Sequence, residues 1–377
     1  MSHRSITALA LVVTGALAVT TVSMPTAFAA DDENQAQSTV TPNSGTPTPE
    51  DTQASSNGAQ SGALAPSDTT DEAGDENASA TPEPADDTPT TIIVQLEDGN
   101  VGIPWYNRIF GLSTSTKHET VKDRIETAVE SSVPGSEVTD VLDYTKAFDG
   151  FAIQAPASSL ETIKATQGVK AAFIERHLKP LVVEGDTGVS GVDAVNPDLK
   201  NGSSLEMTRA NQTSQKGDKQ VIEVIDTGIE STHPAFSGPM DDVPVRLSHK
   251  DVESLVGTLS HGKQGAYLNK KIPFVFDYAD NDANVLPTST KDLSHGTHVA
   301  AIAAANAPDL QGTAPNAQII VAKVAADKDG SIPDSTVLAA LDDAVIIKPD
   351  SINLSLGDDA GWGSEAGTVY AEVYKNL

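Results

Sequence analysis

Three short apolar runs constrain the fold of this 377-residue chain more than any other feature. Each run is nearly continuous in apolar side chains, and the three lie at residues 221–225, 319–324 and 352–356. Runs of this kind are typical of parallel strands that are covered on both faces. Between the second and the third, Asp334 or Ser335 is expected to cap a helix that Pro349 ends. The order strand, helix, strand predicts a βαβ unit, and hence an α/β domain with a doubly wound, mostly parallel sheet.

Two polar side chains stand where these predicted elements end or begin. Asp226 follows the first apolar run directly and precedes a turn at Gly228. His295 precedes Gly296 and an Ala-rich apolar stretch, so it is expected in the first turn of a buried helix. A lone aspartate or histidine is more often structural than catalytic. As a pair, however, a carboxylate at a strand end and an imidazole at a helix start are the orienting acid and the base of a nucleophilic triad.

The composition excludes several functions. The 377 residues include no cysteine, which excludes thiol catalysis, disulfides and zinc–thiolate sites. The formal net charge of −29 argues against nucleic acid and anionic membrane surfaces as partners, because both need a basic face.

The first 90 residues are expected to lie outside any folded domain. Residues 1–29 have a short basic start, an apolar core and a small-residue exit, which is the pattern of a cleaved secretory signal peptide and not of a transmembrane span. Residues 30–90 are rich in Ser, Thr, Pro and acidic residues and contain no aromatic residue. Such a segment cannot bury enough apolar area to offset its ordering entropy, so we expect a disordered acidic tether.

Residues 91–183 are expected to form a small α+β module. Strands and helices are predicted in the ferredoxin-like order β-α-β-β-α-β, with Ser158 and Glu161 as a capping box for the second helix. The stretch 100–114 interrupts this pattern as an insertion. A fold of this kind says nothing about function when taken alone.

Several segments resemble, in the correct order, the subtilisin-like serine peptidases. The matching segments are residues 221–229, 292–300, 312–317 and 350–357. Residues 232–236 and residues 271–280, which fall in a long predicted surface loop, narrow the resemblance to the large cell-envelope peptidases of Gram-positive bacteria, the lactocepin and C5a-peptidase type. The resemblance therefore implies a protein that is secreted or associated with the cell envelope.

The resemblance also implies the roles of the site residues. Asp226 and His295 would be the acid and the base of an Asp-His-Ser acyl transfer that hydrolyses protein and peptide substrates. Ser355, Leu356 and Gly357 would form the cleft edge that pairs with an extended substrate backbone.

The resemblance also implies a role for each part of the chain. Residues 91–183 would be an inhibitory propeptide whose last strand leads into the cleft. Residues 184–377 would be the N-terminal part of the catalytic domain, an incomplete subtilisin-like sheet, and the polar segment 183–215 would hold the maturation cut.

The serine nucleophile of this family is missing from the sequence. No Gly-Thr-Ser-Met-Ala segment occurs before Leu377, and Ser355 follows Asn353-Leu354, where a Gly-x-Ser-x-Gly elbow needs a glycine first. The chain as written is therefore expected to be a fragment without peptidase activity. The alternative is a non-catalytic secreted protein whose propeptide-type module binds and inhibits an intact peptidase.

Two residues depart from the pattern of the family, and none is assigned as a metal ligand. Glu223 stands in place of a small apolar residue and needs a partner or a route to solvent, and Ala301 stands in place of a glycine. His298 is expected to be a packed helix residue, because its spacing from the first histidine does not fit a metal pair. No metal ligand is assigned; structural calcium is an open alternative for which neither residues 306–311 nor the Asp-rich loop 277–282 defines a site.

Overall fold

The computed structural model describes residues 87–98, 114–181, 205, 208–287, 294–308, 310–358 and 363–377. All of them fall in one compact unit. The predicted signal peptide, nearly all of the tether, most of the insertion at 100–114 and most of the segment 183–215 lie outside the described residues. None of the described helices is long and apolar enough to cross a membrane.

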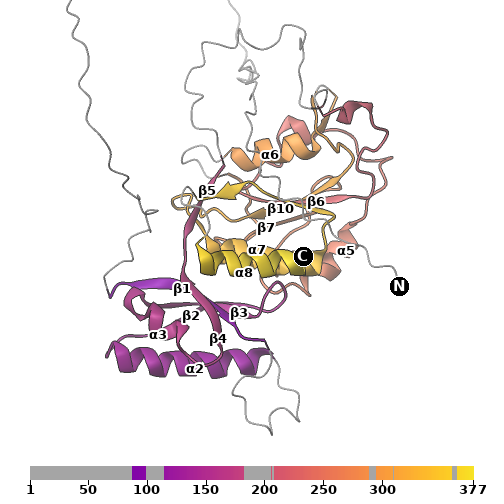
Figure 1. The fold of residues 1–377 in the computed structure, drawn as a ribbon. Coiled ribbons are helices and arrows are strands. Elements are labelled where there is room, and N and C mark those ends of the chain that lie inside the picture. The colour runs from indigo at the N-terminus through magenta and orange to yellow at the C-terminus, as the bar shows by residue number, and fades with distance from the viewer. Residues whose placement is uncertain are drawn as a thin grey trace, which may run out of the picture. The chain divides into compact units, whose positions relative to one another are not determined.

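Residues 89–174 form an antiparallel sheet with helices on one face (Figure 1). The elements are β1 (Pro89–Leu96), α2 (Thr114–Ser132), β2 (Thr139–Tyr144), β3 (Gly150–Pro156), α3 (Leu160–Lys164) and β4 (Val169–Ile174). The element order along the chain is the one that the sequence predicts, and the strands lie in the sheet in the order β2-β3-β1-β4. Ile92 and Val94 of β1 join Val121 and Ile125 of α2 in one core, whereas Ile93 faces the other way. The second face of the sheet is therefore apolar too and packs against the rest of the chain.

The predicted capping box at Ser158 and Glu161 is wrong. A 3₁₀ turn, η1 (Ala157–Ser159), precedes α3 and moves the start of the helical segment back to Pro156. The hydroxyl of Ser158 instead donates to Asp87 at 2.9 Å, and no side chain caps α3. The hydroxyl of Ser158 could serve a local cap or a partner far away in sequence, and the sequence does not distinguish the two.

A second sheet is parallel throughout and has the order β12-β6-β10-β7. Its strands are β6 (Val221–Asp226), β7 (Phe274–Asp277), β10 (Gln318–Lys323) and β12 (Ser351–Leu354). The three predicted strands are thus confirmed as neighbours in an α/β sheet. The segment that contains β7 was expected in a surface loop, and this is wrong: all four β7 residues are buried, because the run Phe274-Val275-Phe276 covers the edge of β10.

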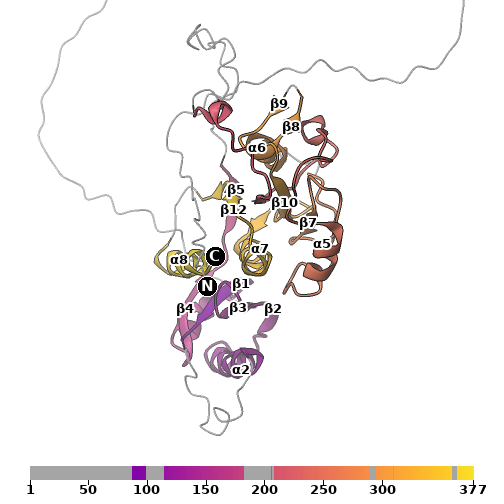
Figure 2. The ribbon, with the colours of Figure 1, turned by 90° about the vertical axis from the view of Figure 1, so that its right-hand side faces the viewer.

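Helices cover both faces of the parallel sheet, as Figures 1 and 2 show. On one side lies α6 (His295–Ala304), and on the other lie α7 (Asp334–Ile347) and α8 (Ser364–Asn376). Alternate residues of β10 serve the two layers: Ile319 packs in the core that contains α6, and Ile320 in the core that contains α7. This arrangement buries the sheet on both faces, which explains the nearly continuous apolar runs in the sequence.

The remaining elements are short. They are β5 (His177–Pro180), η3 (Ala210–Gln212), η4 (Pro234–Phe236), α5 (His249–Val256), β8 (Asn306–Ala307), β9 (Leu310–Gln311), β11 (Ile332–Pro333) and β13 (Leu356–Gly357).

The predicted cap of α7 is also wrong, for a tertiary reason. Pro333 occupies the N-cap position, and no side chain caps the helix. The carboxylate of Asp334 is fully buried and accepts hydrogen bonds from Arg176 Nε (3.0 Å), Arg176 Nη2 (2.9 Å) and the Tyr370 hydroxyl (2.7 Å). The predicted end of the helix is confirmed, since Lys348 takes a left-handed conformation (φ 57°) just before Pro349.

Among the described residues, Glu223 has neither the hydrogen-bond partner nor the route to solvent that a buried carboxylate needs. Its side chain is 0% exposed on β6, and neither carboxylate oxygen has a hydrogen-bond partner among the described residues. Burial raises its pKa from 4.5 to about 8, with a smaller contribution from the charge of Asp343. The side chain is therefore protonated at neutral pH, and the fold carries an unsatisfied acid inside its sheet.

Replacing Glu223 with leucine is expected to stabilise the chain, and increasingly so as the pH rises. Between 4.5 and about 8 the unfolded chain binds fewer protons at this residue than the folded one, so stability falls with rising pH. The slope is about 1.4 kcal/mol per pH unit. Urea unfolding from pH 5 to 8 measures it: Glu223→Leu and the isosteric Glu223→Gln should both remove this slope. A constant difference between wild type and Glu223→Gln across the range would contradict the assignment.

Candidate active site

Asp226 and His295 meet at the carboxyl end of β6. Nδ1 of His295 lies 2.8 Å from Oδ1 of Asp226, within the hydrogen-bond reach that the sequence predicts. The carboxylate is 1% exposed, and the same oxygen accepts the backbone N–H of Thr227 at 2.7 Å. Since a carboxylate can only accept, Nδ1 carries a proton, and the free lone pair of a neutral ring is on Nε2.

Two glycines allow this approach. A Cβ atom at Gly296 would lie 2.2 Å from the carbonyl oxygen of Gly228 and 3.1 Å from Cβ of Asp226. Gly228 has φ +100°, a conformation that L side chains rarely adopt. The N–H of Gly296 donates to Thr227 Oγ1 at 3.1 Å, which joins the start of α6 to the turn after β6. The helix and the strand end are thus locked together, with the imidazole held against the carboxylate.

The pKa of His295 is raised by its surroundings. Burial lowers the pKa of His295, but the hydrogen bond to Asp226, its charge and a backbone hydrogen bond to Leu181 outweigh this and leave the pKa raised. The backbone of Leu181, which follows β5, therefore lies near the imidazole ring.

Leu181 is delivered by β5, which is paired along both edges. On one edge Ile332 of β11 pairs with Leu178, and on the other Leu356 of β13 pairs with Pro180. Both pairings are antiparallel, and the N–H of Leu181 continues the second one by donating to the Ser355 carbonyl at 2.8 Å. The segment Ser355–Gly357 thus pairs with an extended backbone of the same chain, that of residues 179–181, and its pairing with a substrate stays a prediction.

Sequence reasoning missed β5 and β11. The predicted strands of the N-terminal module ended at Ile174, and the four residues of β5 alternate in burial only as exposed, buried, exposed, intermediate. Ile332 and Pro333 give no strand pattern at all. Only the partner strands define these elements, and those partners lie more than 150 residues away from β5 in sequence.

Three other side chains were weighed as site candidates. His298 is exposed on α6, so the expectation of a packed helix residue is wrong; it lies on the solvent side of the helix, because Ala300 and Ala304 occupy the buried side. His233 is a loop residue as expected and accepts the N–H of Ala235 at 3.2 Å. Ser355 donates from its hydroxyl to Asn353 Oδ1 at 3.1 Å.

One acidic group has the separation of a cation site. Carboxylate oxygens of Asp277, Asp280 and Asp327 lie within 4.8 Å of one another. The fully buried ammonium of Lys323, however, lies 2.6 Å from Asp277 and also contacts Asp327. The lysine supplies the positive charge that these carboxylates need, so the group is explained as an ion-pair cluster.

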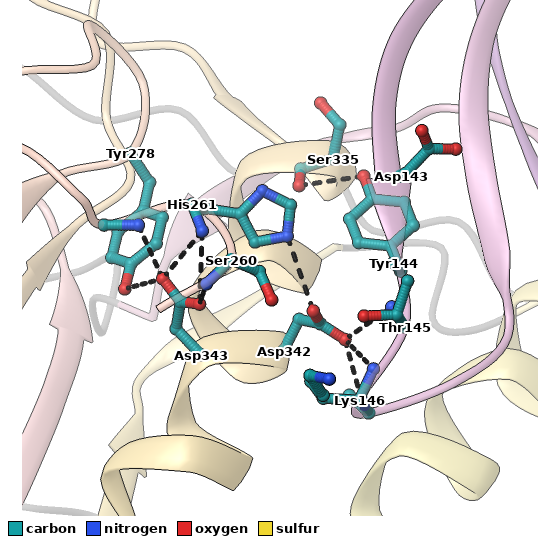
Figure 3. Close-up of polar contacts among 12 residues, drawn as sticks. Asp143, Tyr144, Thr145, Lys146, Ser260, His261, Tyr278, Ser335, Asp342 and Asp343 are labelled. Atoms are coloured by element: carbon teal, nitrogen blue, oxygen red, sulfur yellow. Dashed lines mark hydrogen bonds and ion pairs between the residues drawn. The ribbon is translucent and has the colours of Figure 1, made fainter. Parts of the chain in front are cut away.

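A second contact joins the N-terminal module to α7 (Figure 3). The buried carboxylate of Asp342 accepts three backbone N–H groups from the turn after β2, from Thr145 (3.1 Å), Lys146 (2.7 Å) and Ala147 (2.7 Å). The neighbouring Asp343 accepts backbone N–H groups from a different segment, including those of Ser260 and Gly262 at 2.6 Å each. Adjacent residues of α7 thereby hold two separate loops, one of them from the module.

His118 stabilises the turn that Asp342 holds. Its ring nitrogens lie 2.9 Å from Asp143 Oδ1 and 2.7 Å from Asp149 Oδ1, at the two ends of that turn. Burial lowers the pKa of His118, but the hydrogen bonds to both carboxylates outweigh it and leave the pKa raised. An imidazolium between two carboxylates clamps the turn into the shape that presents its N–H groups to α7.

These features define a class of protein. A buried carboxylate orients an imidazole at the carboxyl end of a parallel strand, an arrangement that fits the acid and the base of a nucleophilic hydrolase.

Comparison with known proteins identifies the family. The sequence model of the Subtilase family matches residues 217–375. The PI-type proteinase of Lactococcus lactis subsp. cremoris is 30% identical over 263 residues, which cover 68% of this chain and 12% of that protein. The C5a peptidase of Streptococcus pyogenes serotype M18 is 26% identical over 256 residues, 66% of this chain and 20% of that protein. The chain belongs to the subtilase family, whose members are serine-type endopeptidases. The predicted branch, the cell-envelope peptidases of the lactocepin and C5a-peptidase type, is confirmed by these relatives.

The extent of the match limits what it shows. The chain spans 12% of the length of the lactococcal relatives. Among solved structures, the epidermin leader peptide processing serine protease of Staphylococcus aureus matches with a TM-score of 0.40 and 14% identity, over 76% of this chain and 56% of that one.

Proposed function

We propose that the chain is part of a secreted subtilisin-like serine endopeptidase precursor. The observation that carries the proposal is the hydrogen bond between Asp226 and His295 at the inner end of a strand-pairing cleft. Asp226 fixes the tautomer of His295 and stabilises the imidazolium, and Nε2 takes the proton of a serine hydroxyl that attacks the peptide carbonyl. Protein and peptide chains in an extended conformation are the substrates, since the edge Ser355–Gly357 binds them through backbone hydrogen bonds.

We further propose that residues 91–183 are the inhibitory propeptide of this enzyme and residues 184–377 part of its catalytic domain. Two contacts support this assignment. The strand β5 lies in the cleft between β11 and β13, where a substrate has to lie. Asp342 and Asp334 of α7, both fully buried, bind the module through hydrogen bonds that form only when it is docked. A signal peptide at 1–29 would direct the precursor out of the cell. An acidic tether at 30–90 would separate the folded part of the precursor from its site of export.

The experiment is made on the protein encoded by the whole gene. Secreted from a Gram-positive host, it should lose its N-terminal module and then hydrolyse denatured casein, and the His295→Ala protein should do neither. A secreted protein that keeps its module, does not hydrolyse casein, and inhibits an added subtilisin would favour the alternative of a propeptide-type inhibitor. The matched control is His298→Ala, which removes an exposed histidine one helical turn away.

A further inference from the structure

We propose that Asp277 and Asp327 are positioning residues of the peptidase. They hold the ammonium of Lys323 away from Asp226, and the carboxylate of Asp226 thereby stays available to His295. The inference rests on the proposed function, and it adds two residues that touch neither the base nor a substrate but on which the acid–base pair depends.

Asp226, Lys323 and Asp277 form a row across the carboxyl edge of the parallel sheet. Lys323 ends β10, and it is the Cα partner of Asp226 in β6 and of Asp277 in β7. The three side chains lie on one face of the sheet, because the residues two positions earlier in each strand all pack in the core that contains α6. None of the three is more than 1% exposed. A buried lysine thus stands between two buried aspartates, one of which orients the base.

Spacing across the sheet does not decide which aspartate the lysine binds. Neighbouring strands lie about 4.8 Å apart, so the two aspartates flank Lys323 at similar distances. The lysine stem runs past the turn that follows Asp226, since a Cβ atom at Gly228 would lie 3.0 Å from Cδ of Lys323. Oδ2 of Asp226 is buried and has no hydrogen-bond partner among the described residues. This oxygen is therefore an acceptor that the ammonium could reach.

Fixed acceptors on the β7 side decide the choice. The ammonium of Lys323 lies 2.6 Å from Oδ2 of Asp277 and also contacts Asp327. Oδ1 of Asp277 accepts the backbone N–H groups of Ala279 (2.9 Å) and Asp280 (3.0 Å), which orients Oδ2 toward the lysine. The carboxylate of Asp280 accepts the N–H of Asp327 at 2.7 Å, so both acceptors of the ammonium belong to one connected group of loops. Two carboxylates on this side outcompete the single one on the other.

Loss of these acceptors would act on the base through Asp226. Three carboxylates face the ammonium of Lys323: Asp226 from β6, Asp277 from β7 and Asp327 from the loop after β10. Without the last two, the ammonium would pair with Oδ2 of Asp226 and offset the charge that stabilises the imidazolium of His295. A cation within about 4–6 Å also lowers the pKa of an imidazole. The histidine would then be a weaker base beside a neutralised acid.

The first test is the kinetics of the mature enzyme made from the whole gene. The double variant Asp277→Asn/Asp327→Asn keeps an acceptor for the loop N–H groups, and it should lower kcat by about 10- to 100-fold with little change in KM. Adding Lys323→Met removes the freed ammonium and should restore most of the lost kcat. A structural role predicts the opposite order, because the triple variant loses more contacts. A triple variant as slow as the double one overturns the inference.

The matched control is Asp280→Asn. It removes a charge from the same cluster, but at an exposed carboxylate that binds a backbone N–H. This variant should keep the wild-type kcat. A loss equal to that of the double variant would mean that the total charge of the cluster matters and not the place of the ammonium, which overturns the inference.

The second test needs no peptidase activity. The pKa of His295 in the 377-residue chain is measured by NMR of isotope-labelled histidine, with His295→Ala to assign the signal. The double variant should lower this pKa by about one unit or more. The shift should persist in about 0.5 M salt, because salt screens a buried contact much less than a distant charge. If the double variant does not fold, Asp327→Asn alone, at a side chain that is 39% exposed, should shift the pKa in the same direction.

The outcomes separate this inference from the proposed function. An active enzyme in which the pKa of His295 is unchanged, or shifts only at low salt, overturns the inference and leaves the proposed function intact. An inactive gene product overturns the proposed function itself, and the titration then still shows whether the two aspartates keep Lys323 from Asp226.

Discussion

Replacing Asp226 with asparagine is expected to lower kcat of the mature peptidase by about 10⁴-fold while leaving the fold unchanged. The asparagine side chain keeps an acceptor for the N–H of Thr227, which now donates to Oδ1 at 2.7 Å. It carries no negative charge to stabilise the imidazolium of His295, and it can hold the ring in the wrong tautomer. The measurement is kcat on a peptide substrate, with the thermal unfolding midpoint as the check on folding.

His295→Ala and the double variant complete this prediction. His295→Ala should lower kcat by about 10⁶-fold, the order found for loss of the histidine in subtilisin. Because the two side chains act as one unit, the double variant should be no slower than His295→Ala alone. Multiplying effects, or an Asp226→Asn enzyme within tenfold of wild type, would show that the 2.8 Å contact is structural and that another group orients the base.

Replacing Arg176 with methionine is expected to lower the free energy of unfolding of the intact chain by about 3–5 kcal/mol. Arg176 immediately precedes β5, and its guanidinium binds the carboxylate of Asp334, which is 0% exposed at the start of α7. Methionine retains the apolar stem but leaves the buried carboxylate with less compensation for its lost hydration. Urea unfolding of the intact chain at pH 7 measures the change.

A partly exposed pair between the same two parts of the chain is the control. Lys170 of β4 lies 2.5 Å from Glu372 of α8, with the two side chains 32% and 27% exposed. Lys170→Met should therefore cost only about 0–1 kcal/mol. Combining Arg176→Met with Asp334→Leu should restore most of the lost stability, since no charge is then left buried. Equal losses for Arg176→Met and Lys170→Met would mean that the Asp334 contact does not hold the module in place.

The acid–base pair could be predicted because each member is marked by local sequence. Asp226 ends an apolar strand, and His295 opens an Ala-rich helix next to a glycine. That these two positions meet was implied by the resemblance of residues 221–229 and 292–300 to the subtilisin-like peptidases, and not by either segment alone. The βαβ unit and the order of elements in the N-terminal module were predictable because periodic apolar patterns identify helices and strands.

The capping predictions failed where tertiary contacts compete for the same polar side chain. Asp334 has the residue type and position of a helix cap, but its carboxylate binds Arg176 and Tyr370 from other elements. Ser158 likewise bonds to Asp87. At Asp334 a cap would contribute about 1 kcal/mol, whereas the buried charge needs several kcal/mol of compensation, so the tertiary partners prevail there.

Strand β5 could not be predicted, because its own sequence has no strand pattern and its extended conformation depends on pairing with β11 and β13. His177–Pro180 has an exposed lysine and a proline, and it becomes a strand only between β11 and β13. For the same reason, Glu223 could be recognised as unusual but not placed. Only the structure shows that its layer of the core offers the carboxylate no donor among the described residues.

In the proposed peptidase, His295 activates a serine once the N-terminal module has been removed. The measurement that tests this directly is labelling of the whole gene product by a fluorophosphonate probe, followed over the course of maturation and read by intact mass. We predict one probe per mature molecule, slow labelling before the N-terminal module is removed, and none in the His295→Ala protein. Equal labelling of wild type and His295→Ala, or no labelling of the mature protein, would contradict it.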